Sequence, residues 1–60
     1  MTAHEALTEL VQDLQRRADA CTSLARTSSD PTDANRLWAA ASAYDHAAEL
    51  AQAALDKVQP

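Results

Sequence analysis

The sequence lacks glycine, phenylalanine and isoleucine altogether, and it contains only two aromatic residues. Alanine makes up a quarter of the chain and β-branched residues are scarce, so the composition favours α-helix. Apolar and polar residues do not alternate in any stretch, so no strand is expected. A chain without glycine and with few loop residues is also poorly suited to form an oxyanion hole. We therefore expect an all-α protein without catalytic residues.

A single cysteine and the absence of a metal-binding motif limit how so short a chain can be stabilised. Cys21 cannot form a disulfide within the chain. It lies among apolar residues and lacks a basic neighbour, so we interpret it as a small hydrophobe, with an intermolecular disulfide as the alternative. Small scaffolds usually need a disulfide, a metal or a partner. Because no cluster has the spacing of a standard metal site, we expect a homodimer without metal or cofactor.

The chain has no surplus of positive charge and no long apolar run. Its formal net charge of −4 argues against binding to nucleic acid or to anionic membranes. The N-terminus lacks a secretory signal, and no run approaches the ~20 apolar residues of a membrane span. We expect a cytoplasmic protein. The surplus of arginine over lysine and the abundance of alanine point to a bacterial or phage genome rich in GC pairs.

Two capping signals divide the chain into helices. Thr2 and Glu5 have the spacing of a capping box, in which the Thr2 hydroxyl accepts from the Glu5 amide and the Glu5 carboxylate from the Thr2 amide. Asp30 followed by Pro31 predicts a second N-cap. We predict one domain over residues 1–60, with helices at 3–28 and 31–58 joined by a turn at 28–31. So short a connection requires the helices to pack antiparallel as a hairpin.

The apolar residues of the second helix cover an unusually wide arc. Two adjacent stripes, 34–58 and 40–54, together span roughly 160° of its circumference. Such a helix suits a position between two neighbours, so we expect the hairpin to dimerise into a four-helix bundle. We predict that the dimer core contains Leu7, Leu10, Leu14, Cys21, Leu24, Leu37, Ala41, Tyr44, Ala48, Ala51 and Leu55.

Some charged and aromatic residues lie outside or beside this arc. Arg17 belongs to the first helix and lies at the edge of that helix's apolar stripe, between Leu10 and Leu24. There its side chain can cover apolar surface while the guanidinium reaches Asp13, four residues earlier. Trp38 is expected in the core or the dimer seam near Leu24. The alternative is that Trp38 forms an anchor for another protein together with Arg36 and Leu37. The acidic residues of the polar arc form a further candidate surface for a partner: Asp45, Glu49 and Asp56.

A metal site on the second helix is an alternative interpretation of its polar residues. His46 and Glu49 are three residues apart, and a dimer would double the pair. Di-iron bundles, however, use the order Glu-x-x-His and direct these side chains into the core. A solvated face is therefore the preferred interpretation.

The residues Asp45-His46-Ala47, Glu49-Leu50 and Leu55 recur at the same spacing in the second helix of the Rop family of plasmid copy-number regulators, which the hairpin resembles. The resemblance implies an antiparallel four-helix-bundle homodimer, and RNA binding as an alternative function. Lys, Asn, Gln and Phe of the first helix contact RNA in that family. This chain has other residues there: Ala3, Leu10, Leu14, Ala18 and Ala25. We therefore expect an adaptor, regulator or inhibitor that acts by protein–protein association.

Overall fold

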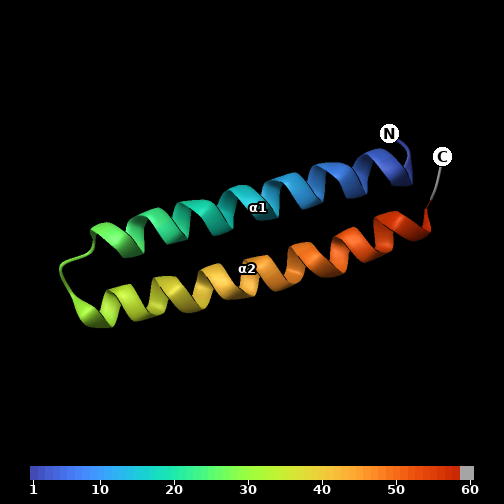
Figure 1. Ribbon diagram of the computed structural model, residues 1–60. Helices are drawn as coiled ribbons and strands as arrows, with labels where there is room; N and C mark the ends of the chain where they lie inside the picture. Colours follow the sequence, from blue (N-terminus) through green and yellow to red (C-terminus); the bar gives the residue numbers. More distant parts are fainter. Residues whose placement is uncertain (59–60) are drawn as a thin grey trace.

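The computed structural model, which describes residues 1–58, is an antiparallel hairpin of two helices (Figure 1). Helix α1 spans Ala3–Thr27 and helix α2 spans Pro31–Lys57. Its Cα atoms extend 45 × 16 × 11 Å along the three principal axes of the hairpin. The two helices lie side by side along their whole length. The all-α hairpin expected from the sequence is confirmed. Each helix ends one residue before the predicted boundary, because Ser28 and Val58 have left helical geometry.

The first turn of α1 is capped largely as the sequence indicates. The Glu5 amide donates to Thr2 Oγ1 over 3.1 Å. The Glu5 carboxylate accepts from the Thr2 hydroxyl, also over 3.1 Å, and not from the Thr2 amide as a full capping box requires. One helical N–H is therefore satisfied by a side chain, and the acidic group lies at the positive end of the helix dipole.

The turn between the helices is held by short polar side chains. The Ser28 hydroxyl accepts from the Asp30 amide at 3.3 Å, and Asp30 Oδ1 accepts from the Thr32 amide at 2.9 Å. Pro31 occupies the start of α2, where its missing N–H has no cost. No residue of the described chain has a positive φ. The turn therefore needs no glycine, which explains how a chain without glycine reverses direction.

Replacing Asp30 by alanine tests this cap. Asp30→Ala should lower the free energy of unfolding by about 0.5–2 kcal/mol, since the Thr32 amide loses its acceptor. Thermal unfolding followed by circular dichroism measures the change. Asp30→Asn keeps an acceptor oxygen and should retain most of the stability. Equal losses in the two variants would contradict a capping role.

The seam between the helices is built from small side chains. On α1 the buried residues recur every seven positions, at Val11, Ala18 and Ala25. Those of α2 are Ala41, Ala48 and Ala51. No large side chain among the described residues is fully buried. The seam therefore allows close packing of the helices, but it removes little apolar surface from water.

Candidate association surface

The predicted dimer-core residues fall into three groups in the single chain. Ala41, Ala48 and Ala51 are already buried in the seam between α1 and α2. Leu10 and Leu24 are 45% and 56% exposed. The others are half-buried: Leu7, Leu14, Cys21, Leu37, Tyr44 and Leu55. The set thus includes both the seam of the hairpin and residues that the hairpin itself does not cover.

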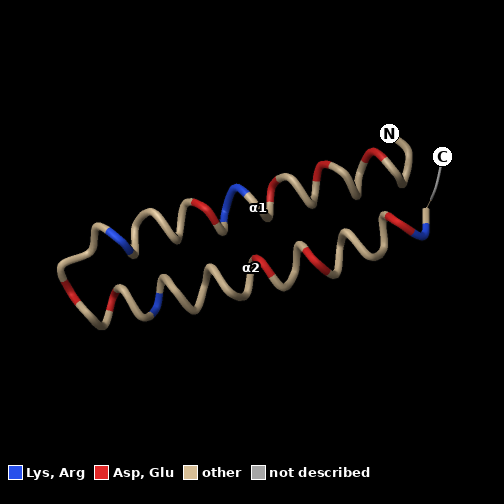
Figure 2. The backbone as a smooth tube through the Cα atoms, viewed as in Figure 1, with Lys and Arg blue, Asp and Glu red and all other residues tan. Residues whose placement is uncertain are grey.

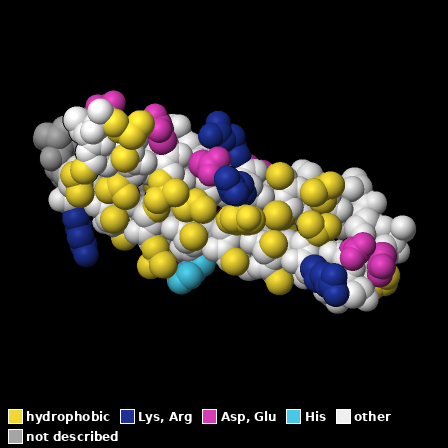
Figure 3. Space-filling view, turned by 180° about the vertical axis from the view of Figure 1, so that it is seen from behind, with side chains coloured by type: hydrophobic (Ala, Val, Ile, Leu, Met, Phe, Trp, Pro, Cys, Tyr) yellow, Lys and Arg dark blue, Asp and Glu magenta, His cyan; other side chains and the backbone are white. Residues whose placement is uncertain are grey.

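An apolar face runs along one side of the hairpin and spans both helices. Figure 3 shows hydrophobic side chains gathered along most of the length of this side. At 100° per residue, these residues lie beside the seam on the same side. We define the apolar face as Leu7, Leu10, Leu14, Cys21 and Leu24 of α1 with Ala40, Tyr44, Ala47, Leu50 and Ala54 of α2.

The loop end of the apolar face is hollowed. The hollow lies between the helices and brings Leu24 of α1 together with Arg36 and Leu37 of α2. Trp38 is not one of the residues that line it. Residues two apart on a helix point in different directions, so Arg36 and Trp38 do not form the single anchor considered above. Trp38 is 44% exposed and lies on the other side of the seam.

An ion pair interrupts the apolar face at the middle of the molecule. Arg17 Nε donates to Asp13 Oδ2 over 2.9 Å, as the sequence predicts, and Arg16 lies 3.8 Å from the same carboxylate. The pKa of Arg17 is raised above its ordinary value, first by the hydrogen bond to Asp13 and then by interaction with the Tyr44 phenol of α2. Arg17 therefore interacts with a residue of each helix, Asp13 of α1 and Tyr44 of α2.

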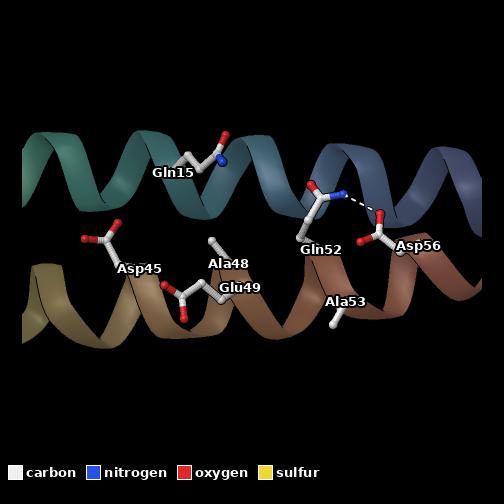
Figure 4. Close-up of a pocket in the computed structure, with 7 residues that line it drawn as sticks. All are labelled: Gln15, Asp45, Ala48, Glu49, Gln52, Ala53 and Asp56. Carbon is white, nitrogen blue, oxygen red and sulfur yellow. Dashed lines mark hydrogen bonds between the residues drawn. The ribbon is translucent and has the colours of Figure 1, made fainter.

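A polar groove lies along the other side of the seam (Figure 4). The predicted acidic residues Asp45, Glu49 and Asp56 all line it. Gln52 Nε2 donates to Asp56 Oδ1 over 3.0 Å. The remaining lining residues are Gln15, Ala48 and Ala53. In Figure 2 these carboxylates follow one another along the second half of α2, which gives this side of the hairpin a negative potential.

The polar residues of α2 do not converge on a metal site. Within residues 1–58, no three His, Cys, Asp or Glu side chains lie close enough together to hold a metal ion. Glu49 lines the polar groove and His46 is exposed. Cys21 is free and half-buried on the apolar face.

Two groups of apolar residues lie outside the predicted dimer core. Val11, Ala18 and Ala25 are apolar positions of the first helix in the sequence, and they form the α1 side of the seam. Leu50, which is 61% exposed, was also left out of the predicted dimer core. Leu50 belongs to the second apolar stripe of α2, and the sequence signal for it was the width of the apolar arc.

The likeness to known proteins extends no further than the two-helix hairpin. Ala18 and Ala25, which the Rop resemblance would place on an RNA-contacting face, are only 2% and 5% exposed in the seam. None of the described helices is long and apolar enough to cross a membrane. The resemblance to Rop rests on the hairpin and the short second-helix similarity. No family model, curated protein or solved structure matches the chain.

Proposed function

We propose that this chain is a non-enzymatic association protein whose apolar face binds a second copy to form a four-helix bundle. The observation that supports this proposal is the position of the large hydrophobic side chains. Leu10, Leu24 and Leu50 lie on the apolar face with 45–61% of their surface exposed, whereas the seam buries alanines and one valine. Contiguous exposed apolar surface of this kind is typical of protein–protein interfaces.

The surface area of the hairpin supports the same proposal. The accessible surface is 4323 Å² for a mass of 6.4 kDa, whereas a compact monomer of that mass exposes about 3,800 Å². A long side of 45 × 16 Å offers an area on the order of 700 Å², close to the ~800 Å² that each partner buries in a stable complex. One additional copy therefore suffices to cover the apolar face.

Such a dimer leaves the polar groove of each hairpin on its outer surface. The acidic side chains Asp45, Glu49 and Asp56 then stay accessible. An adaptor, regulator or inhibitor acts through a surface of this kind, which self-association does not use. We assign any contact with a further protein to this groove, where the negative charge favours a basic partner.

Replacing Leu50 separates dimerisation from hairpin folding. Leu50→Gln keeps the helix propensity but removes a leucine that the hairpin leaves 61% exposed. Burial of one leucine contributes ~1.5–3 kcal/mol and the symmetric dimer contains two, so the dimer dissociation constant should rise at least about 100-fold. Sedimentation equilibrium measures this constant.

Ala53→Gln is the matched control, because Ala53 is exposed on α2 and lines the polar groove on the other side of the seam, which the dimer leaves uncovered. Its dissociation constant should stay within about threefold of that of the unmodified chain, as for a surface substitution outside any interface. Equal dissociation constants for the Leu50 variant and the unmodified chain would contradict the proposed interface.

A further inference from the structure

The charged pair in the apolar face occupies a symmetric position. Gln15 and Tyr44 are the midpoints of α1 and α2, since the helices span Ala3–Thr27 and Pro31–Lys57. Asp13 and Arg17 lie two residues to either side of Gln15. Arg17 also continues the exposed seven-residue spacing of Leu10 and Leu24, so it lies within the surface that a second copy would cover.

We propose that the second copy docks with its loop at the opposite end, so that Asp13 of each copy pairs with Arg17 of the other. The proposal rests on the proposed homodimer. In this orientation the two-fold axis lies between the two copies, at the level of Gln15 and Tyr44. Helix α1 of one copy then packs antiparallel on α1 of the other. Residues equally far from Gln15 on either side then lie at the same height. Asp13 of one copy meets Arg17 of the other, twice, and the pair is self-complementary.

Side-chain size along α1 fits this register. Leu10 of one copy comes to the height of Ala20 of the other, and Leu24 to the height of Ala6. Each exposed leucine is therefore opposite an alanine, which is also exposed. A large residue against a small one is the arrangement that lets facing layers interdigitate. Charge and size thus favour the same axis.

The other face-to-face orientation lacks this complementarity. With both loops at one end, α1 of one copy faces α2 of the other. Arg17 then comes to the height of residue 42, where the apolar face of α2 carries Ala40, Tyr44 and Ala47 and no carboxylate. The second copy then offers no opposite charge to Arg17, which keeps only Asp13 of its own chain. The orientation with loops at opposite ends gives each of these covered charges a partner on the other copy as well.

A distance between the two loops tests the orientation directly. Ser29→Cys combined with Cys21→Ser gives the full chain one thiol in the turn for a spin label. Ser29 is fourteen residues from the midpoint of α1, so opposite loops place the two labels ~40 Å apart at 1.5 Å per residue. Loops at the same end would bring them within ~20 Å, since neighbouring helix axes are 8–10 Å apart. A dimer with the short distance overturns the proposal, whereas a chain that stays monomeric also overturns the proposed function.

Exchange of charges tests the pairing itself. Asp13→Arg and Arg17→Asp should each raise the dimer dissociation constant ~tenfold or more, because like charges then meet at the two-fold axis. An equal mixture of the two variants should form a heterodimer with the affinity of the unmodified chain to within ~threefold, since every charge regains a partner. Arg16→Asp is the control, because Arg16 is 75% exposed and points away from the apolar face. If the mixture contained homodimers and heterodimers in random proportions, the pairing of Asp13 with Arg17 would be contradicted.

Discussion

Val11→Asp is expected to unfold the protein. Val11 is 5% exposed and is the largest of the six side chains buried in the seam. An unpaired carboxylate at this position costs several kcal/mol, which is comparable to the whole stability of a domain of this size. The helical signal in circular dichroism should disappear at 25 °C, and the dimer should be lost with it.

Gln12→Asp is the matched control for this experiment. Gln12 is the next residue of α1 and is exposed, so the substitution adds the same charge without burying it. Its effect on the free energy of unfolding should stay within about 0.5 kcal/mol. A Val11 variant that remains as helical and as stable as this control would show that the seam is assigned to the wrong residues.

The second large effect is expected at the most deeply buried residue of the seam. Ala18 is 2% exposed, the smallest exposed fraction among the seam residues. Ala18→Leu inserts three carbon atoms into this packed contact and forces the helices apart. Overpacking of this kind typically costs about 1–3 kcal/mol, although leucine is nearly as good a helix former as alanine. Chemical denaturation should show the loss as a lower midpoint.

Ala53→Leu provides the comparison, because Ala53 of α2 is exposed in the polar groove, outside the proposed interface, and the same atoms are added there. It should change the midpoint of denaturation little. If the Ala18 variant had the higher midpoint of the two, the burial of Ala18 in the seam would be contradicted.

Features that depend on residues close in sequence were predictable. The cap at Asp30 and Pro31 and the ion pair between Asp13 and Arg17 need only three or four residues of helix or turn geometry. For these features, side-chain chemistry and spacing are sufficient. The antiparallel hairpin follows from them, because the turn is too short for any other arrangement.

Which apolar residues of α2 pack into the seam, and which stay exposed, was not predictable in the same way. Ala41 and Leu50 both lie on the apolar arc of α2, but Ala41 is 4% exposed and Leu50 is 61% exposed. Which stripe enters the seam depends on the rotation of each helix about its axis, and that rotation is set by packing between residues far apart in sequence. The alanine stripes alone do not decide it, because both are apolar and of similar width.

The positions of Arg36 and Trp38 likewise depend on the direction in which each side chain leaves the helix. Their closeness in sequence suggested one anchor, yet only Arg36 lines the hollow next to Leu24. Two residues correspond to about 200° of helix rotation, which puts the side chains on different sides. A partner surface on a helix is therefore better sought at spacings of three, four and seven residues.

Sedimentation equilibrium of the unmodified chain over a wide concentration range, with helicity followed in parallel, tests the central claim most directly. The proposed dimer predicts a mass of two chains at high concentration. It also predicts that this mass and the helical signal decrease together on dilution, because the seam alone buries little apolar surface. A fully helical monomer at every concentration would contradict the claim that the apolar face binds a second copy.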